Sequence, residues 1–321
     1  MILVAVAFSV GRFSVTPGQL VAVLWSKLTG VPHDLPPAVD TVVVNVRGPR
    51  IAAAILVGGA LAAAGAAYQG LFRNPLVSPD ILGVSTGSAL GAVLGIYFSL
   101  GVVAIQTLAF VVGLGAVAIV YFVGAALRRH DPVLILVLAG IVIGTLLGSC
   151  VSLLKYLADP YNQLPAITFW LLGSLASVTP ADVRAVVPSV VLGLVPLLLL
   201  RWRMNVMTLG EDEARALGVD TRRLRLAVIG AATLMTAAVV SISGVVGWIG
   251  LLVPHLARLL VGPDFRRLLP ASILLGAGYL LGVDTLARTL ARIEVPLGVL
   301  TAFIGAPFFI WVLASSRRGW Q

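Results

Sequence analysis

Long apolar runs, separated by Pro, Gly and Arg, occupy most of this chain of 321 residues. About 20 apolar residues in a helix cross the roughly 30 Å hydrocarbon core of a bilayer. Apart from closed barrels, only helices satisfy every backbone hydrogen bond there. We therefore expect an all-α fold, with residues 1–321 forming a single polytopic membrane domain. The predicted membrane-spanning helices are residues 51–70, 82–99, 102–126, 133–157, 181–200, 225–243, 246–261, 268–288 and 297–314.

The composition also indicates a membrane protein, and it argues against a nucleic-acid-binding protein and a disulfide-bonded one. Hydrophobic residues make up 59% of the chain and charged residues 11%, against about 25% charged in soluble domains. The net charge of +9 is divided among short clusters between apolar runs, not gathered in one basic segment, so we expect no nucleic-acid partner. A lone Cys150 excludes an intrachain disulfide and a multi-cysteine metal site. We expect membrane lipid around the chain, and no metal or cofactor in it.

The first ten residues, MILVAVAFSV, are too short to cross a bilayer. No basic segment precedes them and no cleavage site follows, as a signal peptide would require. We interpret them as the end of a first helix whose beginning is missing here. The complete subunit would then contain ten transmembrane helices.

The positively charged residues predict the orientation. If successive spans alternate in direction, 14 of the 22 Lys and Arg fall on one side and 8 on the other. The richer side should be cytoplasmic. It includes the pair Arg128 and Arg129, the stretch 201–225 and the C-terminus, whereas Arg47 and the aromatic segment 155–183 lie outside. We expect a bacterial inner-membrane protein.

The longest polar stretch is residues 201–225, on the predicted cytoplasmic side. Gly210 and Gly218 are breaks that suggest two short helices. Such a pair could plug a groove in a partner protein, but an ordinary solvated loop fits the composition equally well. The residues assigned to partner contact are Leu209, Gly210, Glu211, Glu213, Arg215, Leu217 and Gly218.

Four sequence blocks in order resemble the FecCD family, the permeases of type II ABC importers. LGEDEARALGVD at 209–220 is similar to the family's coupling loop. RGPRIAAAILVGGALAAAGAAYQGLFRNPLVSPDILGVSTGSALGA at 47–92 resembles its second and third helices. GWIGLLVPHLARLLVGPDFRRLLPAS at 247–272 and DTLARTLARIEVPLGVLTAFIGAPFFIWVL at 284–313 resemble its eighth helix and its last two helices.

The resemblance implies partners and a cargo class. It implies a second permease copy, in a homodimer or a close heterodimer, with two ATP-binding subunits inside and a periplasmic substrate-binding protein outside. ATP and Mg²⁺ would belong to the partner ATPase, so this chain is not expected to be an enzyme; it contains no G-x-x-x-x-G-K-[ST] motif. The family transports metal chelates by alternating access. We expect ferric siderophore or haem first and cobalamin next. Because specificity resides largely in the binding protein, the sequence of this chain does not fix which chelate is carried.

Arg47, Arg50 and Arg288 are expected at the outer membrane surface. The resemblance implies that they receive carboxylates of the binding protein, since matching arginines do so in the family's cobalamin importer. Arg suits this role because its planar fork holds a carboxylate through two hydrogen bonds. The alternative is that these side chains only snorkel to the interface. Asp284, four residues before Arg288, is expected to pair with it along one helix.

The transport pathway should be lined by small and apolar residues of helices such as 82–99. Its candidate residues are Ser85, Thr86 and Ser88. Segment 155–183 should be an outer loop containing a short helix. Its aromatic residues fit either an interfacial belt or a periplasmic gate, and the sequence does not separate the two.

Two other classes of membrane protein were weighed. A secondary transporter usually places ionisable residues near the midplane, whereas the 13 Asp and Glu here fall mostly in turns or at helix ends. A membrane-embedded enzyme needs a cluster of His or carboxylates, but the three His are far apart in sequence. The secondary transporter remains the alternative, and it would work without an ATPase.

Overall fold

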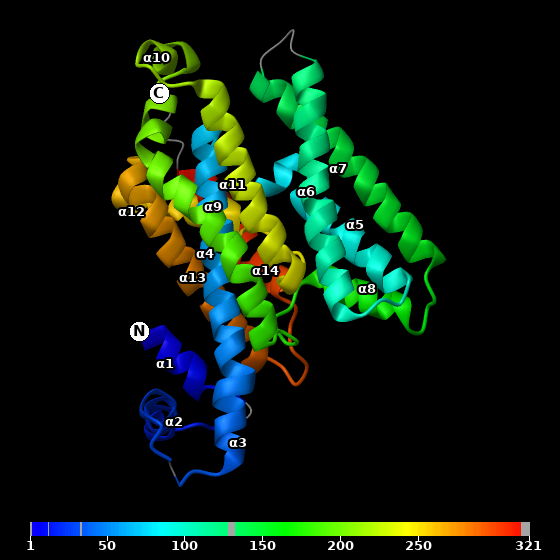
Figure 1. Ribbon diagram of the computed structural model, residues 1–321, viewed down its shortest axis with the longest axis vertical. Coiled ribbons are helices and arrows are strands. Elements are labelled where there is room, and N and C mark those ends of the chain that lie inside the picture. The colour runs from blue at the N-terminus through cyan, green and yellow to red at the C-terminus, as the bar shows by residue number, and fades with distance from the viewer. Residues whose placement is uncertain (1, 12, 33, 128–131, 316–321) are drawn as a thin grey trace.

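The computed structural model describes residues 2–11, 13–32, 34–127 and 132–315, and this part of the chain is built from helices (Figure 1). Within these described residues, six helices are long and apolar enough to cross a membrane. The elements are α1 (Ile2–Ser9), α2 (Pro17–Thr29), α3 (Pro37–Asp40), the π-helix η1 (Thr41–Arg47), α4 (Gly48–Leu71), the 3₁₀ turn η2 (Pro79–Leu82), α5 (Val84–Tyr97), α6 (Val102–Ala126), α7 (Pro132–Leu157), α8 (Gln163–Leu172), α9 (Pro180–Met207), α10 (Glu211–Ala216), α11 (Thr221–Ser243), α12 (Ile249–Val261), α13 (Phe265–Thr289) and α14 (Leu297–Ser315).

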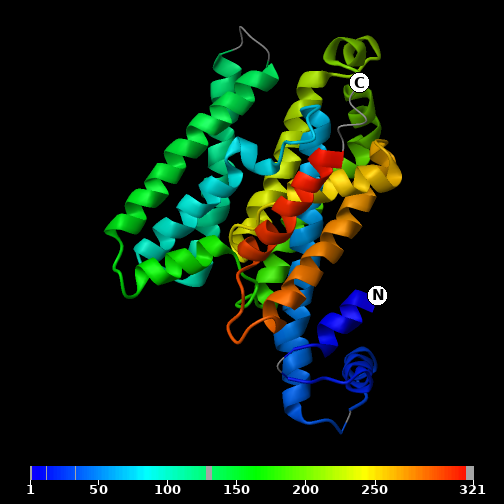
Figure 2. The same ribbon diagram turned by 180° about the vertical axis from the view of Figure 1, so that it is seen from behind.

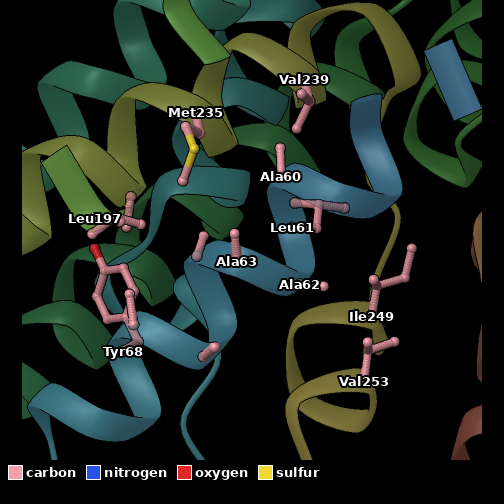
Figure 3. Packing of buried hydrophobic residues seen from close by; sticks show 14 of the residues in the cluster. Ala60, Leu61, Ala62, Ala63, Tyr68, Leu197, Met235, Val239, Ile249 and Val253 are labelled. Carbon is pink, nitrogen blue, oxygen red and sulfur yellow. The ribbon is translucent and has the colours of Figure 1, made fainter. Parts of the chain in front are cut away.

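A central helix organises the bundle. α3, η1 and α4 run without a break as one helix, Pro37–Leu71, and 83% of its most apolar 18-residue window is buried. Nine alanines and five glycines among the 24 residues of α4 give it small side chains, so neighbouring helices can approach it closely. Helices α9, α11, α12 and α13 pack directly around it. Figure 3 shows this small-residue face of α4 meeting larger side chains such as Leu197, Met235 and Ile249.

Glycine allows α4 to approach two of its neighbours at backbone distance. A Cβ added to Gly65 would lie 2.6 Å from the Cα of Gly250 on α12. A Cβ added to Gly58 would lie 2.8 Å from the carbonyl carbon of Gly276 on α13. In a membrane, where lipid is as apolar as the protein, such close packing is a main source of helix association.

Helices α5, α6, α7 and α8 form a second group beside the first (Figures 1 and 2). α5 and α6 pack closely, with the backbone of α6 at Leu108 against Gly91 of α5. α11 touches both groups, since it packs on α4 and also on α6. The outward helix of this group is α7, of whose most apolar window only 11% is buried.

The structure confirms helices at all nine predicted spans and corrects several lengths. The predicted span 82–99 is α5, which has only 14 residues because Gly83, with φ of 80°, separates it from η2. α9 continues to Met207 and α11 begins at Thr221, so the predicted loop 201–225 is mostly helix ends. The prediction of two short helices there was wrong: one, α10, is present. The short helix predicted within 155–183 is confirmed as α8.

Two helical segments were not predicted from the sequence: residues 37–50, which extend the predicted span 51–70 toward the N-terminus, and α2. α2 follows Thr16-Pro17-Gly18-Gln19, in which Thr16 and Gln19 cap each other's backbone and Pro17 occupies the first helical position. This capping box is a known start signal. The predicted fragment of a first helix at the N-terminus is helical as α1. Residues Arg128, Arg129 and the predicted cytoplasmic C-terminal tail lie outside the described residues.

Candidate functional site

α10 projects from one end of the bundle, opposite the end that carries α2 and α3 (Figure 1). Gly210, with φ of 140°, and Gly218, with φ of 82°, bracket it in conformations that disfavour other residues. Ala214 is fully buried against the bundle, whereas Leu209 and Leu217 are 61% and 57% exposed. The segment therefore packs on its own chain on one side and presents apolar side chains outward on the other.

Glu211 fastens α10 to α11. Its carboxylate pairs with Arg225 of α11, whose side chain is only 10% exposed, and with Arg215 of α10 at 3.1 Å. Glu213, Arg215 and the exposed Asp212 face outward. Of the residues predicted for partner contact, Gly210 is buried and Glu211 is engaged within the chain, while Leu209, Glu213, Arg215, Leu217 and Gly218 are exposed.

A polar hollow of about 750 Å³ lies beside α10. Arg73 in the turn after α4 and Val133 at the start of α7 line it together with residues 209–213. The structure thus brings the predicted partner-contact segment next to the turn between α4 and α5. The hollow offers both charge signs, from Arg73 and from the acidic residues of α10.

Side-chain hydrogen bonds join α9 to the start of α13 at the same end. The Asn205 side chain donates to Asp264 at 2.6 Å and accepts from the Phe265 backbone N–H at 2.7 Å. Asp264 also accepts from the backbone N–H of Arg266, capping α13. The hydrogen bond from the Arg266 backbone N–H has the largest effect in lowering the pKa of the Asp264 carboxyl, and the hydrogen bond from Asn205 lowers it further. The cap therefore stays ionised in mildly acidic conditions.

At the opposite end, Arg50 is held by two carboxylates. Its Nε lies 3.0 and 3.1 Å from the two oxygens of Asp284. Its two terminal nitrogens each donate to one oxygen of Glu294 at 2.9 Å. Arg50 is 6% exposed and Asp284 is fully buried. All three guanidinium nitrogens therefore donate to carboxylates within the chain.

Arg47 and Arg288 bind the end of α1. Arg288 donates to the Ala7 carbonyl at 3.1 Å, and Arg47 donates to the carbonyls of Phe8 and Phe13. Carbonyls in the last turn of a helix lack helical partners, and cations favour that end of the helix dipole. Arg288 also lies 3.3 Å from Asp284 one turn earlier, which confirms the predicted intrahelical pair.

The three arginines predicted to dock a partner thus lie together, yet they are buried: Arg47, Arg50 and Arg288 are 4%, 6% and 9% exposed. They are not extended toward solvent, and their role in docking stays a prediction. Sequence reasoning missed Glu294 as a partner of Arg50. The scarcity of carboxylates in so apolar a chain could have pointed to Glu294, because ionisable residues in membrane proteins usually pair with one another.

The three predicted pathway residues have different surroundings. Ser85 is buried and donates to Asp80. Ser88 is fully buried, with its Oγ directly against Gly113 of α6. Thr86 is partly exposed on the side of α7, near Gly148. Burial within this chain favours Thr86 over Ser88 as a lining residue, and the pathway role of all three stays a prediction.

An apolar hollow of about 650 Å³ lies where α8, α12 and α14 approach one another. Leu172 of α8 and Trp248, just before α12, form part of it, with Ala302 and Phe303 of α14. Trp248 adopts a left-handed φ of 71° at the break between α11 and α12. This smooth, apolar surface has the chemistry predicted for a pathway, but it is built by other helices than the one expected.

Apolar helices long enough to cross a membrane, with short helices between them and a projecting α10, define a multi-pass membrane protein. Residues 1–315 match the FecCD transport family, and the chain belongs to this family. The resemblance inferred from the four sequence blocks is thereby confirmed.

Relatives agree over nearly the whole length. The molybdate import system permease protein MolB of Haemophilus influenzae is 40% identical, with 99% of this chain and 94% of MolB covered. The cobalamin import system permease protein BtuC of Halobacterium salinarum is 42% identical over 87% of this chain and 75% of that protein. A solved inward-facing metal-chelate type ABC transporter matches with a TM-score of 0.88 and 38% identity, covering 98% of this chain and 96% of that one.

Proposed function

We propose that this chain is the membrane-spanning permease of an ATP-driven importer that moves a metal chelate from the periplasm to the cytoplasm. The observation that carries this proposal is α10, which is fixed to the bundle through Ala214 and Glu211 while Leu209 and Leu217 remain exposed beside a polar hollow. An exposed apolar pair on a short rigid helix suits insertion into a groove of a partner. That partner is the ATP-binding subunit, which supplies ATP and Mg²⁺.

The assembly contains a second permease copy, two ATP-binding subunits and a periplasmic substrate-binding protein. The end with α10 is cytoplasmic, in agreement with the excess of Lys and Arg on that side. The C-terminus is on the same side, and Arg47, Arg50 and Arg288 lie at the periplasmic surface, where the binding protein docks. Membership in the FecCD transport family supports this arrangement.

The cargo is a ferric siderophore or haem in the first place, and cobalamin in the second. Relatives named for molybdate and cobalamin import support a metal-containing cargo. The apolar hollow at α8, α12 and α14 suits a bulky ligand that slides past without a tight polar site. Thr86 and the hollow together form part of its route.

Reconstitution tests the proposal. The permease is purified with its ATP-binding subunit, placed in liposomes and supplied with the binding protein loaded with radiolabelled ferric siderophore, haem or cobalamin. We expect uptake that requires ATP hydrolysis. Changing Glu211→Arg together with Gly218→Val should reduce coupled uptake at least tenfold while membrane insertion is retained, because α10 lies outside the hydrocarbon.

Lys27→Gln, at the opposite end of the chain, is the control and should transport normally. Its ion pair with Asp40 is long, at 3.8 Å, and exposed, so it contributes little. Uptake driven by an ion gradient without any ATPase would overturn the proposal in favour of a secondary transporter. Normal uptake by the Glu211 and Gly218 double variant would refute the role of α10.

A further inference from the structure

The two carboxylates that hold Arg50 differ in a way that suggests different roles. Asp284 lies inside α13 and is fully buried. Glu294 lies in the connection between α13 and α14, and its side chain is 33% exposed. Asp284 is therefore a permanent counterion, whereas Glu294 covers Arg50 from the solvent side and can leave without unfolding a helix.

The geometry leaves one place for an incoming carboxylate. A guanidinium has two edges that bind a carboxylate through paired hydrogen bonds, and Arg is favoured where such paired recognition matters. Asp284 lies against Nε, and Glu294 occupies the edge formed by the two terminal nitrogens. A carboxylate from another protein can bind Arg50 in this paired fashion only where Glu294 now binds.

Charge favours such an exchange. Arg47, Arg50 and Arg288 cluster with Asp284 and Glu294, which gives three positive and two negative groups and a net charge of +1. When Glu294 leaves, the remaining groups carry +2. An incoming carboxylate restores the balance, while Asp284 keeps Arg50 compensated throughout. A buried charge without any partner would be costly.

The connection that carries Glu294 leads directly to the apolar hollow. Val295 donates to the Ala287 carbonyl at 3.2 Å, and Leu297 at the start of α14 donates to the Gly173 carbonyl after α8 at 3.0 Å. The next residue, Gly298, lies against the carbonyls of Leu172 and Val245. Leu172, Val245 and Gly298 all line the hollow. A movement of Glu294 is therefore transmitted to the walls of that hollow within a few residues.

We propose that Glu294 is an internal stand-in for a carboxylate of the docking protein, and that exchange of the two on Arg50 links docking to α14. This inference rests on the proposed function, in which a substrate-binding protein docks at this end. The docking protein presents an Asp or Glu side chain to the terminal edge of Arg50. Glu294 and residues 290–296 are then released.

The test measures affinity of the purified substrate-binding protein for the permease–ATPase complex in lipid nanodiscs. Glu294→Gln removes the internal competitor and should tighten docking three- to tenfold at low salt. Asp34→Asn, an exposed position between α2 and α3, removes one negative charge elsewhere and should change docking less than twofold. Asp284→Asn should not tighten docking, because it loosens Arg50 without freeing the outer edge.

A double-mutant cycle separates exchange from a general charge effect. In an Arg50→Lys background the paired edge is absent, so Glu294→Gln should no longer tighten docking.

A second readout uses a spin label at Ile293, which is 83% exposed, in a Cys150→Ser background. Its motion should increase when the binding protein docks, and it should already be high in the Glu294→Gln variant.

The possible outcomes are distinct. If the unmodified complex binds no substrate-binding protein, the proposed function fails and the inference fails with it. If the unmodified complex docks and Glu294→Gln docks equally or more weakly, the exchange is wrong while the proposed function stands. Equal tightening by Glu294→Gln and Asp34→Asn would also overturn the exchange, because charge alone would then explain the effect.

Discussion

α4 and α7 are both apolar helices, but they have opposite surroundings. The most apolar window of the helix containing α4 has a mean hydropathy of 1.9 and is 83% buried, while that of α7 has 2.6 and is 11% buried. α4 is rich in Ala and Gly, whereas α7 carries exposed large side chains such as Leu138, Val142 and Leu146. The buried helix is therefore distinguished by small residues, and the exposed helix is the more apolar of the two.

The difference follows from the solvent. Lipid accepts large apolar side chains as readily as protein does, so a helix gains little by hiding them. A helix surrounded by other helices must instead be thin, so that neighbours come within contact of its backbone. α4 meets this requirement at Gly58 and Gly65. α7 makes a close backbone contact at Gly140, against Ile81, but at Gly144 an added Cβ would meet nothing within 4 Å.

The largest expected effect comes from thickening α4. Gly65→Ala would force α4 away from α12 at Gly250, and overpacking of this kind costs about 3 kcal/mol. Gly144→Ala on α7 is the matched control and should leave the free energy of unfolding within about 1 kcal/mol of the parent, since Ala is the better helix former. Unfolding of the purified chain by SDS in mixed micelles measures both. Equal destabilisation by the two changes would remove the contrast between the helices.

A smaller effect is expected from the polar contacts of α4. Gln69 donates to the carbonyls of Gly250 and Leu251 and accepts from Arg258 at 3.1 Å. Gln69→Leu should destabilise the chain by about 2 kcal/mol, because hydrogen bonds to charged groups contribute about 1.5–3 kcal/mol.

The matched change for this second prediction lies on α6. Gln106 donates to Asp182 at 3.0 Å from a partly exposed position. Gln106→Leu should cost under about 1 kcal/mol, because water can replace the lost partner. The same micelle titration reports both variants, and a larger loss for Gln106→Leu would contradict the proposed order.

The smallest effect tests one hydroxyl. The Tyr68 hydroxyl of α4 hydrogen-bonds the Thr233 hydroxyl of α11 at 3.1 Å in a fully buried position. Tyr68→Phe should cost about 1 kcal/mol, the usual net contribution of such a bond. Thr145→Val on α7 should cost almost nothing, since that hydroxyl bonds only to Ile141 in its own helix at an exposed position. Thermal unfolding in detergent measures the stability of both variants.

Much of the fold could be predicted from the sequence because bilayer thickness fixes helix length. All nine predicted spans contain helices, although Arg50 and Arg201, the expected boundaries, lie inside helices. The errors occurred where local backbone chemistry decides. α5 is short because Gly83 is left-handed, and α9 continues past Arg201 because a charged residue need not end a helix that leaves the membrane.

The sequence predicted which residues form the sites, but it predicted their contacts and burial less well. Arg47, Arg50 and Arg288 do lie together, and Asp284 does pair with Arg288. Their burial could not be read from the chain, because it depends on α1 and Glu294, which are distant in sequence from Arg50. Ser88 looked suitable for a pathway, but a hydroxyl on a small-residue helix also serves close packing, as it does against Gly113.

The pair between Glu211 and Arg225 has a mechanical consequence. Arg225 stands in the second turn of α11, and α11 runs between the two helix groups, touching α4 on one side and α6 on the other (Figure 1). A displacement of α10 would therefore act on the helix that contacts both groups. α11 thus links α10 to the group of α5 to α8 and to α4, while the glycine contacts hold α4, α12 and α13 together at backbone distance.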